Sequence, residues 1–175
     1  MINQQEKSPE AILNSAVDAL KILRSQECSL DEYLDDHAQD PLLRRRLSNL
    51  LFTLFRRRNA LVNALRKHCR RDPEKSLHDL LLAALTMAVF QKSLPPESVV
   101  NISVDLAKKR FSRNAGNFVN AVLRKAISSV DVNCDPLPEN IRRQWQKNFP
   151  GAEYSRLTDY EKRIFNLQSR QSVES

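Results

Sequence analysis

Glycine is nearly absent from this sequence, which has two glycines in 175 residues. β-Branched residues also fail to gather into the alternating runs that a half-buried strand requires. So little turn-forming glycine and no strand pattern predict an all-α fold. The length is sufficient for one domain with a hydrophobic core, plus a short appendage.

Long apolar runs and clustered metal ligands are missing as well. No segment has the length and apolar character of a membrane span, and the first residues are too polar for a signal peptide, so we expect a cytoplasmic protein without a membrane partner. Three widely spaced cysteines, Cys28, Cys69 and Cys134, form no CxxC pair and are expected to be free thiols. His37 and His78 have no neighbouring ligand cluster, so neither a metal site nor a catalytic histidine is expected.

Positive charge, by contrast, is abundant and unevenly distributed. The net charge is +7, yet residues 1–41 hold nine acidic and three basic side chains. Residues 42–71 hold ten basic side chains and no acidic one, and residues 106–130 hold six and none. Clusters of Lys and Arg bind polyanions by releasing condensed counterions, so the two basic blocks favour a polyanionic partner. The alternative is a solvated basic face that balances acidic neighbours.

Helix start signals divide the first part of the chain. Ser8-Pro9 predicts a helix that ends near Ser25, and the S-x-x-E capping box at residues 29–32 opens a short acidic helix. Asp40-Pro41 starts a third helix, which is expected to run to about residue 70 because no glycine or proline lies between Pro41 and Pro73. It would be the longest element of the fold.

Three further core helices and an extension are predicted after that point. Asp72-Pro73 starts a fourth helix that is apolar on more than one side and should be central and buried. Pro96 starts the fifth, and the sixth spans about 114–128. Residues 1–130 then form the domain, 131–138 a proline-containing linker, 139–168 a C-terminal helical extension with helices near 139–148 and 157–167, and 169–175 a disordered tail.

The segment FVNAVLR at residues 118–124, preceded by SVVNISVDLAKKRFSRNAG, closely resembles the signature of the NusB-like domain. The segments SLDEYL and LLLAALTMAVFQ extend the resemblance over residues 8–130. That domain occurs alone as the transcription antitermination factor NusB and as the N-terminal domain of RsmB-type ribosomal RNA cytosine-5 methyltransferases. The resemblance implies a NusB-like bundle of about six core helices, here with one or two extra C-terminal helices.

Details of the motif resemble the RsmB branch more than free-standing NusB. The motif ends in Arg124, and Leu137-Pro138-Glu139 followed by Trp145 resembles the connection into a methyltransferase domain. The sequence nevertheless has no glycine-rich turn for adenosylmethionine and no Pro-Cys nucleophile pair. We therefore expect no catalytic residue and no cofactor in this chain, although a longer parent could be an adenosylmethionine-dependent RNA methyltransferase. The sequence does not determine whether the protein is a monomer or a dimer.

The basic face is expected to differ from that of NusB. The N-terminus MINQQEKSPEA lacks the arginine-rich end that contributes to the RNA surface of NusB, so the cations must come from the third helix and from residues 106–130. The predicted RNA-binding residues are Arg45, Arg46, Arg56, Arg57, Arg58, Arg66, Lys67, Arg70, Lys108, Lys109, Arg110, Arg113, Arg124 and Lys125.

Other residues of the motif are expected to be structural. We expect the Asn120 amide to bond a neighbouring backbone group, and Gly116 to permit close helix approach rather than to bind a ligand. Trp145 and Phe149 are expected to dock the extension rather than to stack on bases.

The prediction is thus a non-catalytic RNA-binding helical domain. It would act in ribosomal RNA transcription antitermination or as the RNA-docking N-terminal part of a ribosomal RNA methyltransferase. The alternative is an adaptor that binds a ribosomal or transcription protein through a helical groove.

Overall fold

The computed structural model of the protein describes residues 8–25, 28–134 and 139–148. Every regular element among these residues is a helix, and the predicted all-α fold is confirmed. The chain divides into two compact units, residues 1–134 and residues 135–175. The second unit contains α8 (Glu139–Asn148), whereas the predicted helix at 157–167, the tail and Phe149 lie outside the described residues.

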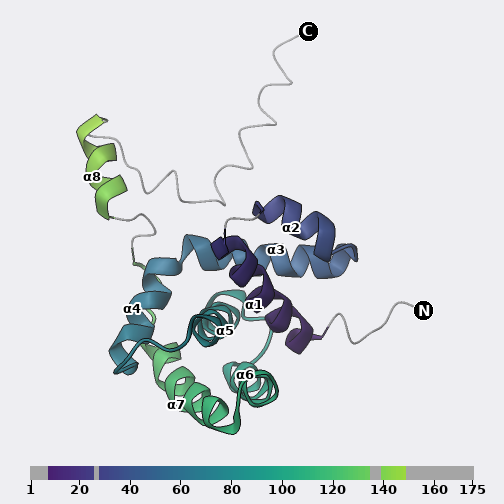
Figure 1. The fold of residues 1–175 in the computed structure, drawn as a ribbon. Coiled ribbons are helices and arrows are strands. Elements are labelled where there is room, and N and C mark those ends of the chain that lie inside the picture. Colours follow the sequence, from purple (N-terminus) through teal and green to yellow (C-terminus); the bar gives the residue numbers. More distant parts are fainter. Residues whose placement is uncertain (1–7, 26–27, 135–138, 149–175) are drawn as a thin grey trace. The chain divides into compact units, whose positions relative to one another are not determined.

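The described residues of the first unit form seven α-helices (Figure 1). They are α1 (Pro9–Ser25), α2 (Leu30–His37), α3 (Pro41–Arg56), α4 (Arg58–His68), α5 (Lys75–Thr86), α6 (Pro96–Arg110) and α7 (Arg113–Ser129). A π-helical turn, Met87–Gln91, continues α5 and ends at Lys92, whose φ of 49° lies in the left-handed region.

Side-chain caps fix the predicted helix starts. Ser29 and Glu32 form the reciprocal capping box at the start of α2. The Asp40 carboxylate accepts hydrogen bonds from the backbone N–H groups of Leu42 and Leu43, at 3.0 and 2.9 Å, and so satisfies two orphan donors of α3. Ser112 caps α7 in the same way. These predicted starts are confirmed.

The prediction of one long third helix is wrong, because the helix breaks at Arg57. Arg57 has φ −102° and ψ 12°, a conformation open to any residue, so neither glycine nor proline is needed. In Figure 1, α4 turns away from the axis of α3 and runs toward α7. The turn lets Leu61 and Leu65 join the buried core, so tertiary packing decides the break.

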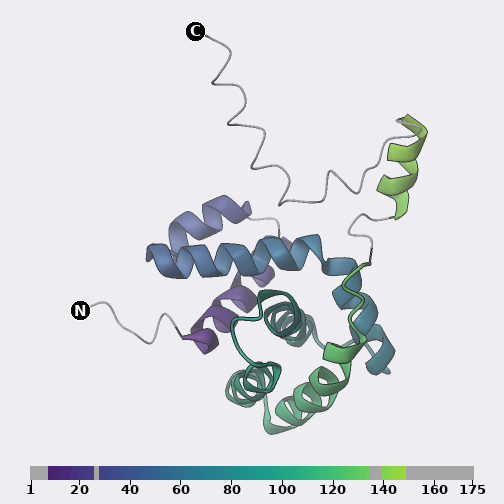
Figure 2. The ribbon, with the colours of Figure 1, turned by 180° about the vertical axis from the view of Figure 1, so that it is seen from behind.

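Helix α5 occupies the centre of the bundle, as predicted (Figures 1 and 2). Residues Leu80 to Leu85 are fully buried, and the helix contacts α1, α3, α4, α6 and α7. Its predicted start at Asp72-Pro73 is two to three residues too early. The helix begins at Lys75, because Glu74 is still extended, with ψ 143°, while its carbonyl accepts the first hydrogen bond from His78.

Helices α6 and α7 approach each other closely at Gly116. A Cβ atom at Gly116 would lie 2.5 Å from Cγ of Lys108 and 3.2 Å from the carbonyl oxygen of Val104. The prediction that Gly116 allows close helix approach is therefore confirmed.

Candidate nucleic-acid interface

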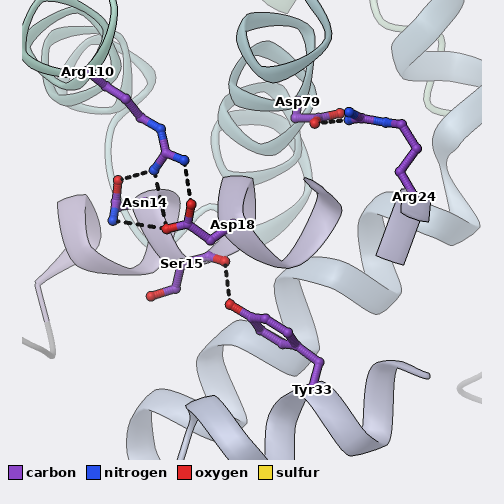
Figure 3. A network of polar contacts seen from close by, with 7 residues as sticks. All are labelled: Asn14, Ser15, Asp18, Arg24, Tyr33, Asp79 and Arg110. Carbon is purple, nitrogen blue, oxygen red and sulfur yellow. Dashed lines mark hydrogen bonds and ion pairs between the residues drawn. The ribbon is translucent and has the colours of Figure 1, made fainter. Parts of the chain in front are cut away.

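The basic end of α6 is tied to acidic residues of α1. Nζ of Lys109 lies 2.7 Å from Oε1 of Glu10. The Arg110 guanidinium pairs with the Asp18 carboxylate and donates to Oδ1 of Asn14 at 2.6 Å (Figure 3). The hydrogen bond to Asp18 raises the pKa of Arg110, whose side chain is only 24% exposed. Two of the predicted RNA-binding residues are thus engaged in holding α6 to α1.

Lys108, the third cation of this run, has a local partner. Its Nζ lies 3.4 Å from Oδ1 of Asp105, one helical turn earlier, and its stem covers Gly116. The structure therefore does not bring residues 108–110 together as one open cationic patch.

A second ion pair joins the other end of α1 to the core. The Arg24 guanidinium pairs with Asp79 of α5, whose residue exposure is 5% (Figure 3). Nearby, the Tyr33 hydroxyl donates to the carbonyl oxygen of Ser15 at 3.4 Å, and burial raises the pKa of this phenol. Sequence reasoning missed Arg24 and Asp79 because they are 55 residues apart and neither belongs to a motif.

The cations of α4 differ from those of α6. Arg66, Lys67 and Arg70 are exposed at and just beyond the end of α4, and none forms an ion pair with a residue that the structure describes. Helix α4 packs on α7, and Nε2 of His68 lies 2.7 Å from Oγ of Ser129 near the ends of both helices.

Helix α7 presents three further exposed cations, Arg113, Arg124 and Lys125. Nε of Arg124 donates to Oδ1 of Asn120 at 2.9 Å. The Asn120 side chain therefore bonds a guanidinium, and the prediction that it bonds a backbone group is wrong. The packing of α4 on α7 places two exposed basic segments, about 50 residues apart in sequence, on neighbouring helices.

The arginines of α3 and of its junction with α4 have different surroundings. Arg45 and Arg46 are exposed, and Arg56 is half-buried. The Arg57 guanidinium lies 5.5 Å from the centroid of the Phe90 ring and donates to the carbonyl oxygen of Val132, whereas Arg58 is exposed. Within the arginine triplet at 56–58, Arg57 therefore has a structural role, whereas Arg58 faces solvent.

A pocket opens between α1, α3, α4 and α5, with a volume of about 670 Å³. Arg58 and Arg66, both predicted RNA-binding residues, lie in its wall with Lys75 and His78. Burial lowers the pKa of His78, as do the charges of Arg58 and Arg24, while Asp79 and Asp72 oppose them. No sequence signal marks this pocket, because four separate helices contribute to it.

No three His, Cys, Asp or Glu side chains among the described residues lie close enough to hold a metal ion. Cys28 and Cys69 are free thiols, as expected. None of the described helices has the length and apolar character needed to cross a bilayer.

The described residues of the first unit form an all-α bundle with exposed cations on several helices, which is compatible with a polyanionic ligand. The sequence profile of the NusB family matches residues 13–128, and the chain belongs to the NusB family. Membership implies a non-catalytic helical domain of the RNA-binding, antitermination type. Searches of curated proteins and of solved structures found no match.

Proposed function

We propose that this protein binds RNA through the exposed cations of α4 and α7, and that the RNA is ribosomal. The role would be transcription antitermination of ribosomal RNA or the docking of ribosomal RNA for a methyltransferase. The observation that carries the proposal is the contrast between two sets of three cations. Arg66, Lys67 and Arg70 are exposed at and just beyond the end of α4 without an ion pair to any described residue. The cations at 108–110 are paired.

Exposed Lys and Arg side chains suit phosphate contacts. Their charged ends reach solvent while their stems lie along the helix surface, so a phosphate can be neutralised without burial of charge. Arg113, Arg124 and Lys125 add cations on α7, and Arg45, Arg46 and Arg58 add cations around α3. This distribution fits a backbone-directed ligand better than a single base-reading element.

The affinity for a single-stranded ribosomal RNA fragment, measured by fluorescence anisotropy over a series of salt concentrations, tests the proposal. Each neutralised phosphate of a single strand adds about 0.7 to the magnitude of the log-log slope. We expect a slope of several units. A slope near zero would contradict the RNA proposal, because it would mean that no phosphate is neutralised on binding.

The finer assignment rests on the sequence motif. Arg124, which ends FVNAVLR, and the segment Leu137-Pro138-Glu139 support a relationship to the N-terminal domains of RsmB-type methyltransferases. Such a domain would act in the cytoplasm. In that case RNA carrying the methylation target should compete with the fragment, whereas an antitermination role predicts preference for the leader RNA of a ribosomal operon. A competition series with both RNAs separates the two roles.

One observation favours the adaptor alternative. Leu42, Phe52 and Phe55 of α3 are 39%, 49% and 40% exposed, which is high for large apolar side chains in a small domain. A ribosomal or transcription protein that covered them would bind by apolar contact. Its affinity would then vary little with salt, in contrast to that of RNA.

A further inference from the structure

The pocket between α1, α3, α4 and α5 has the size of a ligand site. Its volume of about 670 Å³ falls within the range of roughly 300–1,000 Å³ that small-molecule sites occupy. All of its lining residues belong to the first unit and are described. Nothing in the family assignment or the motif gives this pocket a role.

The pocket lining has an excess of positive charge, even when the ion pair between Arg24 and Asp79 is left out of the count. Arg24 and Asp79 both line the pocket, but each satisfies the other. Arg58, Arg66 and Lys75 remain, and none of them forms an ion pair with the described part of the chain. One carboxylate, Asp72, opposes these three cations. An anionic group in the pocket would therefore be stabilised.

The rest of the lining is apolar and includes an aromatic ring. Phe55 is 40% exposed although it borders the pocket, and Val62 and Leu65 continue the apolar surface along α4. A flat, uncharged ring system that packed on Phe55 would bury this exposed surface. Stacking on an aromatic side chain is the usual means by which proteins hold an unpaired base.

His78 adds a hydrogen-bonding group to the wall of the pocket. Its ring forms no hydrogen bond with the residues of the described segments, and burial lowers its pKa. The ring is therefore neutral near pH 7, with one nitrogen that donates and one that accepts. Such a group suits the edge of a base or a ribose hydroxyl.

We propose that this pocket binds one nucleotide, with its phosphate at Arg58, Arg66 and Lys75 and its base against Phe55 and Val62. The nucleotide belongs either to a single-stranded RNA, in which case the inference rests on the proposed function, or to a free mononucleotide with the same chemistry. The combination of an aromatic ring with three cations favours a nucleotide over an acidic peptide, whose carboxylates would not use Phe55.

The chain offers matched controls for both halves of the pocket. Phe52 and Phe55 are both exposed phenylalanines of α3, but only Phe55 lines the pocket. Arg66 of α4 and Lys21 of α1 are both exposed cations, but only Arg66 lines it. Each pocket variant therefore has a partner of similar exposure and charge outside the pocket.

The experiment titrates the full chain with AMP and, separately, with a short oligoadenylate, and follows backbone amide NMR shifts and the dissociation constants. AMP should shift the amides of residues around 55–66 and 75–79. Phe55→Ala should weaken AMP binding by about fivefold or more, and Arg66→Ala by a similar factor, because each removes one contact with the base or the phosphate. Phe52→Ala and Lys21→Ala should leave AMP binding within about twofold of wild type.

The outcomes separate the pocket from the wider RNA surface. Absence of AMP-induced shifts at the pocket, or equal losses for Phe55→Ala and Phe52→Ala, would overturn the nucleotide site even if salt-dependent RNA binding persists. AMP binding without oligoadenylate binding would support the pocket as a site for a free mononucleotide. It would rule out a nucleotide of single-stranded RNA as the ligand of the pocket. Binding of an acidic peptide that Phe55→Ala does not weaken, with no response to AMP, would assign the cations to a protein partner and overturn the inference.

Discussion

Two dipeptides of the same composition have opposite surroundings in this protein. Arg66-Lys67 lies exposed near the end of α4, without an ion pair to a described residue, whereas Lys109-Arg110 at the end of α6 is paired with Glu10 and Asp18 of α1. Both sit in a last helical turn, where cations interact favourably with the helix dipole. The tertiary partner therefore decides which pair is available to a polyanion.

The comparison shows why the total charge overstates the binding surface. The acidic N-terminal block and the basic block at 106–130 are far apart in sequence, but α1 packs against α6, and part of the charge cancels there. The cations of α4, by contrast, form no ion pair with an acidic residue of the described segments. Paired cations should influence stability, and exposed cations should influence binding.

The most buried ion pair should give the largest change in stability. Arg24→Ala leaves the Asp79 carboxylate, 5% exposed, without its partner, and should lower the free energy of unfolding by about 2–3 kcal/mol. Urea denaturation followed by circular dichroism measures the change. Asp79→Asn is the control and should cost less, because Arg24 can turn to solvent. Equal losses for the two variants would contradict this description.

Removal of Arg110 should give the next largest change. Arg110→Ala breaks the contacts with Asp18 and Asn14, so the free energy of unfolding should fall by about 1–2 kcal/mol. Arg110→Lys should recover part of this loss, since one ammonium cannot reproduce the two-pronged contact. Lys109→Ala, at an exposed pair, should change stability little. A loss for Lys109→Ala as large as that for Arg110→Ala would contradict the ranking.

The arginine triplet of α3 and α4 allows the same comparison at neighbouring positions. Arg57→Glu should lower the free energy of unfolding by about 1 kcal/mol, because it removes the contact with the Phe90 ring and the hydrogen bond to Val132. Arg58→Glu should leave thermal unfolding unchanged while it weakens RNA binding, because Arg58 is exposed. If Arg58→Glu lowered stability and Arg57→Glu did not, Arg58 would be the structural residue and the prediction would be wrong.

The smallest expected effect is a pH dependence from His78. Because burial lowers its pKa in the folded state below 6.5, the folded protein binds fewer protons than the unfolded chain in the window below pH 6.5. The contribution to stability is therefore present above pH 6.5 and is lost as the pH falls through the folded pKa. In a series of urea denaturations between pH 7 and pH 5, His78→Gln should reduce the fall in the free energy of unfolding. If the variant shows the same fall as the wild type, other groups cause the pH dependence.

Local signals made much of the fold predictable. The capping box at Ser29 and Glu32, the Asp40-Pro41 start and the Ser112 break each specify a helix terminus through atoms within three residues, so the sequence alone contains them. The fully apolar character of residues 80–85 likewise predicted the central helix.

Features that depend on distant partners were not predictable. The break at Arg57 has no glycine or proline and follows from the packing of α4 on α5 and α7. The pairing of Arg110 with Asp18 joins residues 92 apart, and the pocket joins four helices. The family motif identified the fold through residues that pack, such as Val119 and Leu123, and not through the cations that we propose for binding.

The central claim is that the exposed cations, and not the paired ones, bind RNA. The most direct measurement compares the salt dependence of RNA affinity for the wild type and for two double variants, Arg66→Ala/Lys67→Ala and Lys109→Ala/Arg110→Ala, each of which removes one Lys and one Arg. The account predicts that the first variant reduces the magnitude of the log-log slope by about 1–1.5 and that the second leaves it unchanged. Equal reductions for both variants, or a reduction for the second alone, would contradict it.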